Sequence, residues 1–205
     1  MSTDPAITAR YRARLAHGKT GLMALLAALW AKMYDPASPA SVAMIATLAA
    51  TFTTRGQAAA VTHARTYLAA LTTRATGQPA DPYAIPAGVI GMTSSGLTVP
   101  ALAAFAPRLY AARLAAGQDA ATAAGAAQVW LNGLAASEPY RAANATVMTN
   151  AQQDRRLTGR CDRITGPGAC DFCSQIADQG YRPASADFEA HAHCGCTAGP
   201  ELAYS

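Results

Sequence analysis

Residues 4–36 read DPAITARYRARLAHGKTGLMALLAALWAKMYDP. Asp4 followed by Pro5 is a typical helix start, because Asp accepts hydrogen bonds from the free N–H groups of the first turn and proline is preorganised for the first helical position. Behind this start, apolar residues recur at three-, four- and seven-residue spacing, the pattern of an amphipathic helix. The segment therefore predicts one helix of about 28 residues that ends before Asp35-Pro36.

The same signals occur farther along the chain. Ser38-Pro39 predicts a second helix from residue 40 to about 74, with a break expected near residues 53–57, where threonines and a glycine gather. Residues 77–100 contain four prolines and four glycines and predict a long irregular connector, which lies over the helices or over a partner. Further helices are predicted from Val99-Pro100 to Gly117, over residues 118–136, and from Ser137-Glu138-Pro139 to about residue 157.

The composition agrees with a helical chain. Alanine, the best helix former, accounts for 52 of the 205 residues and for half of the 51% hydrophobic fraction. Aromatic residues make up only 7%, so the core is expected to consist of closely packed helices, with Trp30 and Trp130 as anchors. The longest apolar run, Leu22 to Ala31, has about half the length that a bilayer requires, which argues against a membrane span.

The charge divides the chain into two parts. Residues 1–160 carry 14 Lys/Arg and 6 Asp/Glu, a net charge of +8, whereas residues 161–205 carry 2 and 6, a net charge of −4. A basic body suits an anionic partner such as an acidic protein surface or DNA, although a solvated arginine face would have the same composition. We therefore expect a helical body over residues 1–158 and a C-terminal module over residues 159–205.

The five cysteines all lie in this C-terminal module. Cys170-x2-Cys173 is the spacing of a zinc knuckle, and a second cluster, His191-Ala-His193-Cys194-Gly-Cys196, follows about 20 residues later. We predict a structural zinc site formed by Cys170, Cys173 and His191, with Cys194 or Cys196 as the fourth ligand. Disulfides are the alternative, which a reducing cytosol disfavours.

Cys161 lies outside the zinc pattern and is expected to be a strand residue beside the site. No catalytic motif is present: the sequence has no HExxH, no glycine-rich phosphate loop and no Ser-His-Asp set with recognisable spacing. Thiolate-rich ligation would also fill the coordination shell and leave no open position for a substrate. The expected fold is mostly α, an elongated helical body followed by a small α+β zinc-stabilised module, without enzymatic activity.

The residues from Cys170 to Thr197 carry a resemblance to a known family. Cys170-x2-Cys173, Gly180-Tyr181, Phe188 and the ending His191-x-His193-Cys194-x-Cys196-Thr197 resemble the C-terminal signature of phage Mu F-like head morphogenesis proteins, as does Arg163-Ile-Thr-Gly. The actinophage-type members of that family also have an alanine- and arginine-rich helical body before the signature. The resemblance is specific over residues 155–200 and only architectural before them.

The resemblance implies a role as well as a site. His191, Cys194 and Cys196 take the family's final His and Cys positions, whereas His193 stands where asparagine is common. Family members are minor head proteins of the virion, assembled in the host cytoplasm. The expected partners are the portal protein or the major capsid protein, with several copies per particle and possible non-specific contact with packaged double-stranded DNA. The alternatives are a zinc-ribbon nucleic-acid binder, which the acidic module disfavours, and a zinc-containing nuclease.

Overall fold

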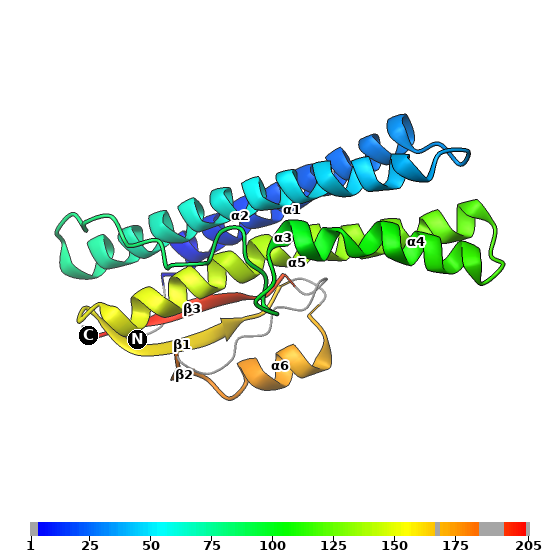
Figure 1. Cartoon of the computed structure of the whole chain (residues 1–205). Coiled ribbons are helices and arrows are strands. Elements are labelled where there is room, and N and C mark those ends of the chain that lie inside the picture. Colours follow the sequence, from blue (N-terminus) through cyan, green and yellow to red (C-terminus); the bar gives the residue numbers. More distant parts are fainter. Residues whose placement is uncertain (1–3, 167–168, 185–194, 204–205) are drawn as a thin grey trace.

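The computed structural model describes residues 4–166, 169–184 and 195–203. Three long helices form most of the described chain: α1 (Pro5–Met33), α2 (Pro39–Thr76) and α5 (Ala120–Gln153). They run side by side as an elongated body, and a small sheet lies against α5 near the end where both termini are found (Figure 1). The predicted mostly helical architecture with a small C-terminal α+β region is therefore confirmed.

Helix α1 follows its sequence signals closely. The Asp4 carboxylate accepts hydrogen bonds from the backbone N–H groups of Ala6, at 2.9 Å, and Ile7, at 3.1 Å, and Pro5 occupies the first helical position. At the other end the chain becomes extended at Tyr34, before the predicted stop. A cap at the start and a proline stop at the end thus fix the 29 residues of this helix.

The break expected in the second helix, near residues 53–57, is wrong: α2 continues through it for 38 residues. Threonine is tolerated in this helix: the Thr51 hydroxyl donates to the Thr47 carbonyl four residues earlier, and Thr53 is buried within the helix. Gly56 lies at a close approach between α2 and its neighbours. A Cβ there would lie 3.2 Å from Cγ of Pro139 and 3.3 Å from Cδ2 of Leu22.

The helix boundary expected at Ser137-Glu138-Pro139 is also wrong. Residues 120–153 form one helix, α5, with Pro139 inside it. Proline lacks the backbone N–H that would bond to the Ala135 carbonyl, yet the helix continues, and the proline ring packs against Gly56 of α2. Packing between helices therefore overrides a local signal that normally starts a helix.

The helix expected from Val99 to Gly117 is divided into two. The short α3 (Val99–Ala103) ends at Ala104, and α4 (Phe105–Ala115) then packs against α5. Gly117 ends this segment as predicted, in the left-handed conformation with φ +82° that favours glycine.

The irregular connector over residues 77–98 lies on the helices, one of the two expected positions. Buried Gln57 of α2 holds it at two points: its side chain accepts from Gly91 N–H and donates to the Met92 carbonyl, both at 2.8 Å. Arg141 of α5 donates to the same Met92 carbonyl at 2.5 Å. These bonds satisfy backbone groups of the connector and hold it against α2 and α5.

The sheet consists of three antiparallel strands in the order β2-β1-β3. Strand β1 (Leu157–Ile164) is central, with β2 (Arg182–Pro183) on one side and β3 (Thr197–Leu202) on the other. The short helix α6 (Asp171–Ala177) follows β1 and lies on the side of the sheet away from the helical body (Figure 1).

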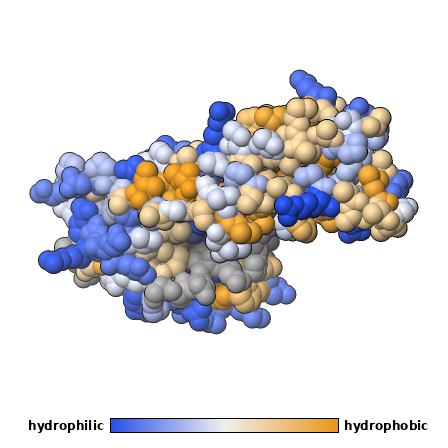
Figure 2. All heavy atoms as spheres, in the orientation of Figure 1, coloured by the Kyte–Doolittle hydropathy of each residue, from blue (hydrophilic) through white to orange (hydrophobic). Residues whose placement is uncertain are grey.

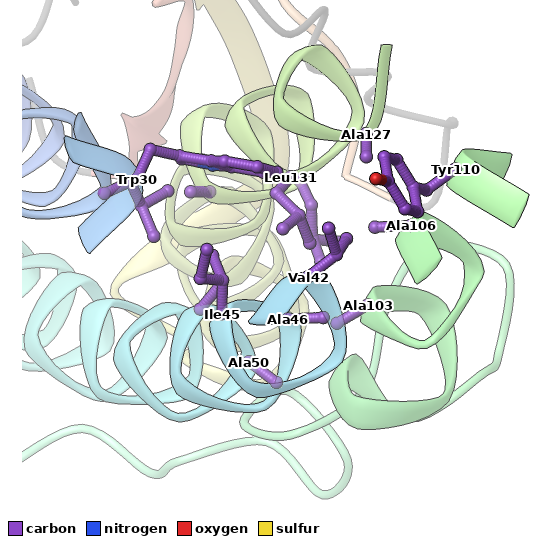
Figure 3. Close-up of a cluster of buried hydrophobic side chains, with 14 of the residues drawn as sticks. Trp30, Val42, Ile45, Ala46, Ala50, Ala103, Ala106, Tyr110, Ala127 and Leu131 are labelled. Carbon is purple, nitrogen blue, oxygen red and sulfur yellow. The ribbon is translucent and has the colours of Figure 1, made fainter. Parts of the chain in front are cut away.

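The hydrophobic core has two main parts. One lies between the helices at the end far from the sheet, where Trp30, Leu131 and Tyr110 pack among alanines of α2, α4 and α5 (Figure 3). Trp30 is buried as predicted, whereas Trp130 is half-buried beside Phe105 and donates its Nε1–H to the Leu102 carbonyl, at 3.1 Å.

The second part of the core joins the helices to the sheet. It combines side chains from all three long helices with side chains from β1 and β3. Its buried members include Tyr11, Leu15, Tyr67, Leu68, Leu71, Tyr140, Val147, Leu157, Cys161 and Ala198. The sheet therefore covers apolar surface that the helices would otherwise expose at this end.

Polarity also differs between the two ends. On the face shown in Figure 2, hydrophilic residues gather at the end that carries the termini, and weakly apolar residues cover much of the opposite end. In the part of the chain that the structure describes, no helix combines the length and the apolar character needed to cross a membrane.

The contact at Gly56 gives a first prediction. Ala is normally favoured over Gly in a helix by about 1 kcal/mol, but Gly56→Ala would press its methyl group against the rigid Pro139 ring. We expect Gly56→Ala to destabilise the protein by about 1 kcal/mol net, because such overpacking costs more than helix propensity returns.

Urea denaturation followed by circular dichroism measures this change. The matched control is Gly125→Ala in α5, where a Cβ would meet nothing within 4 Å. It should stabilise the protein by about 1 kcal/mol. Equal gains in the two variants would show that the helices do not meet closely at Gly56.

Candidate metal centre

The central strand β1 carries a buried arginine close to β3. Arg163 of β1 pairs with Ala198 of β3, and Ile164 pairs with Thr197. Arg163 is 6% exposed, which is unusual for an arginine and requires nearby groups that accept its hydrogen bonds. One of them is a sulfur: Nη1 donates to Sγ of Cys173 at 3.6 Å.

Cys170 and Cys173 stand at the start of α6. Cys170 is the N-cap residue and is half-buried, and Cys173 lies within the first turn and is fully buried. The Cys-x2-Cys spacing therefore corresponds here to one turn at a helix start. A cation beside a cysteine favours the thiolate, the form that binds metals, and the Arg163 guanidinium is in that position for Cys173.

Cys196 enters from the other side, just before β3. It is 1% exposed and forms a small buried cluster with Cys173, against which Cys170 and Ala169 pack. The structure thus brings together three of the five cysteines that the sequence predicted as ligands or neighbours of ligands. Cys170 and Cys173 share one helix start, whereas Cys196 comes from a distant segment that only the folded chain brings next to them.

Asn144 of α5 fixes the backbone at Cys196. Its Nδ2 donates to the Cys196 carbonyl, at 3.2 Å, and its Oδ1 accepts from the Ala198 N–H, at 2.9 Å. Asn144 is 1% exposed, so both backbone groups rely on it in a site shielded from water. Beside it, Gly195 has φ +59°, and a Cβ there would meet the Tyr140 hydroxyl at 3.6 Å. Helix α5 therefore sets the position of Cys196.

The remaining predicted ligands, His191 and Cys194, lie outside the described residues, as does His193. Over residues 4–166, 169–184 and 195–203, no group of three or more His, Cys, Asp or Glu side chains is placed to hold a metal ion. The zinc site thus stays a prediction, and so does the choice between Cys194 and Cys196 as fourth ligand.

The type of donor that the described residues bring together, thiol sulfur, suits zinc, although these residues alone do not form a complete site. Cys173 and Cys196 are buried, where a thiolate requires a compensating positive charge. Zinc accepts sulfur ligands and would neutralise that charge. A purely apolar core would not require several neighbouring cysteines and a buried arginine that bonds to one of them.

Cys161 is a strand residue, as predicted, and belongs to a different environment. It is buried in the core between sheet and helices, apart from the cluster of Cys173 and Cys196. Burial, together with the nearby Asp162 carboxylate, raises the pKa of its thiol to about 12. Cys161 is therefore a neutral thiol at physiological pH and acts as a small apolar side chain.

Two functional positions were not visible in the sequence. Asn144 lies mid-helix, where asparagine has no local role, and its partners are 52 and 54 residues away. Arg163 stands in a strand whose other charges are partly exposed, so its burial beside a sulfur has no local signal. Asn144 acquires its role only where α5 meets the segment at β3, and Arg163 acquires its role only where β1 meets α6.

Comparison with known proteins gives no relative. No family model, no curated protein and no solved structure matches the chain.

The Asn144 contact gives a second prediction. Asn144→Ala removes both bonds and leaves a buried carbonyl and a buried N–H without partners, each of which costs about 1–3 kcal/mol. We expect the free energy of unfolding to fall by about 3 kcal/mol, measured by urea denaturation.

Asn132→Ala, on the same helix, is the matched control. Asn132 Oδ1 is buried without a hydrogen-bond partner in the described chain, so its removal should change stability by less than about 1 kcal/mol. A similar loss in both variants would mean that Asn144 contributes only its volume.

Proposed function

We propose that the protein is a structural minor head protein of a tailed phage, which docks on the portal or on the inner capsid and acts in head assembly or DNA passage. Its C-terminal module, in this proposal, binds one structural zinc ion, and the protein has no enzymatic activity. The observation that carries the proposal is the ending from Cys170 to Thr197, whose cysteine pattern resembles that of the head morphogenesis proteins and whose described cysteines cluster in the fold.

Burial of the cysteines supports a structural role for the metal. A catalytic zinc requires an open coordination position that a substrate can reach, whereas Cys173 and Cys196 are almost completely buried. Zinc would tie the start of α6 to the segment before β3, which meet in one small buried cluster. Two neighbouring side chains would support the ligands: Arg163 lies against the Cys173 sulfur, and Asn144 fixes the backbone at Cys196.

The shape of the body supports docking on a larger assembly. Helices α1 and α2 are 29 and 38 residues long, which corresponds to about 43 and 57 Å at the α-helical rise. Long, nearly parallel helices offer extended faces to a partner, and exposed apolar side chains such as Met44, at 53%, and Val129, at 72%, lie on the body. A protein of this form suits a place between other subunits of a particle.

The metal can be tested directly. Protein purified under reducing conditions without chelator should contain about one zinc ion per chain, as a single tetrahedral site requires. Cys173→Ser should lower the zinc content measured by elemental analysis, because it removes a buried ligand. Cys161→Ser is the matched control and should keep the metal, since the Cys161 thiol belongs to a different cluster. Zinc-free wild-type protein, or equal loss in both variants, would contradict the site.

Association with phage heads tests the role. The protein should sediment with assembled heads in a gradient, and should bind the portal ring when the two are co-expressed. A protein that stayed at the top of the gradient and did not bind portal or capsid would contradict the proposal. Cleavage of DNA by the purified protein, lost in Cys173→Ser, would instead support the zinc-nuclease alternative.

A further inference from the structure

Helices α1 and α2 have an unusual charge. Their 67 residues contain eight basic side chains and no Asp or Glu: Arg10, Arg12, Arg14, Lys19, Lys32, Arg55, Arg65 and Arg74. Solvated helices normally intersperse both signs, because opposite charges one turn apart stabilise each other. A helix pair without any carboxylate presents a surface that is favourable to an anionic partner.

Some of these cations are used within the fold. Arg12 and Arg65 donate to the backbone carbonyls of Thr165 and Tyr83, which ties α1 and α2 to the segments beside them. Arg74 lies 3.6 Å from the carboxylate that caps α1. By contrast, the exposed side chains of Arg10, Arg14 and Arg55 have no carboxylate within 4 Å anywhere in the described ranges.

The three remaining arginines line one groove between α1 and α2. Two adjoining hollows make up this groove, of about 130 and 280 Å³, and they share Arg14 and His63. Arg10 borders the first hollow and Arg55 borders the second. His63 lines both hollows, and burial together with the Arg14 charge lowers its pKa.

The floor of the groove is apolar. Leu15, Leu22 and Phe52 lie along it, and Leu25, at 38% exposed, stands at its end. Gly18 also lines the groove. The space where its Cβ would lie is empty to a distance of 4 Å, so the absence of a side chain leaves this part of the groove open. An apolar floor between guanidinium groups suits a ligand that is itself apolar on one side and anionic at its edges.

We propose that the α1–α2 groove binds an acidic amphipathic helix of a partner protein. Apolar residues one turn apart on such a helix would fill the floor, as in other helix-in-groove complexes, and flanking carboxylates would pair with Arg10, Arg14 and Arg55. The groove extends along α1 from Arg10 to Leu25, about 22 Å at the α-helical rise, which matches a segment of about 15 residues.

Charge alone would also attract DNA, but the groove favours a polypeptide. A duplex binds through its phosphates, so it would contact the guanidinium groups and leave the apolar floor between Leu15 and Phe52 in contact with water. A helix with one apolar face covers the floor and pairs the cations at once. The partner is thus defined by two properties together, acidity and an apolar stripe.

A synthetic peptide tests this inference with the purified full chain. The probe is a labelled helical peptide of about 15 residues with leucines at three- and four-residue spacing and glutamates on both flanks. The control peptide has glutamine in place of each glutamate and the same leucines. Fluorescence anisotropy should show that the acidic peptide binds and that the glutamine peptide binds about ten-fold more weakly, because three exposed ion pairs are lost.

Two matched pairs of variants locate the binding site. Gly18→Leu fills the floor and should abolish binding, whereas Gly21→Leu, which also has open space at its Cβ but does not line the groove, should leave binding unchanged. Arg14→Gln should weaken binding about three-fold, the value of one exposed ion pair. Arg108→Gln, an exposed arginine on α4, should not.

The results separate the proposal from its rivals. Binding of the glutamine peptide as tight as that of the acidic peptide would overturn the role of the arginines. Equal effects of Gly18→Leu and Gly21→Leu would overturn the groove as the site. Binding of a labelled DNA duplex that Arg14→Gln weakens and Gly18→Leu does not, without binding of the acidic peptide, would identify the surface as a phosphate contact instead. None of these results depends on the proposed place of the protein in a phage head.

Discussion

The close contact of Gly56 with Leu22 and Pro139 is the constraint on which the rest of the arrangement depends. All three long helices meet there, and a Cβ would lie only 3.2 Å from Pro139 and 3.3 Å from Leu22. One residue farther along, Gln57 is buried by this approach and bonds to the connector and to Glu138 of α5. Because the helices come so near, alanine side chains are large enough to fill much of the interface. The alanine-rich composition therefore matches the close packing of the helices.

The helices show both what local signals can predict and where they fail. Asp4-Pro5 predicted the start of α1 correctly, since the cap needs only its own first turn. The same kind of signal at Ser137-Glu138-Pro139 failed because Glu138 is buried against α2, where Gln57 bonds to its carboxylate at 3.2 Å. Arg141, one turn along the same helix, pairs with this carboxylate at 2.6 Å. A buried carboxylate does not act as an exposed residue of a first turn, and only the folded chain supplies Gln57.

The candidate metal centre also has features that the sequence predicted and features that it did not. The spacing of the cysteines predicted that Cys170 and Cys173 belong together, because one helical turn joins them. The pattern of a divided site left Cys194 or Cys196 open as the fourth ligand, and the structure places Cys196 beside Cys173. The support from Asn144 and Arg163 did not follow from the pattern, because Asn144 reaches Cys196 across 52 positions of sequence and Arg163 reaches Cys173 across 10.

The shared core between helices and sheet couples the two ends of the sequence thermodynamically. Tyr11 of α1, Tyr140 of α5 and Ala198 of β3 lie in one buried cluster, and Asn144 adds a polar link to Cys196. A ligand that binds only the folded state raises the stability of everything that unfolds with its site. A metal held by the cysteines would therefore raise the melting temperature of the helical body as well. Loss of that metal would lower the stability of helices that make no contact with it.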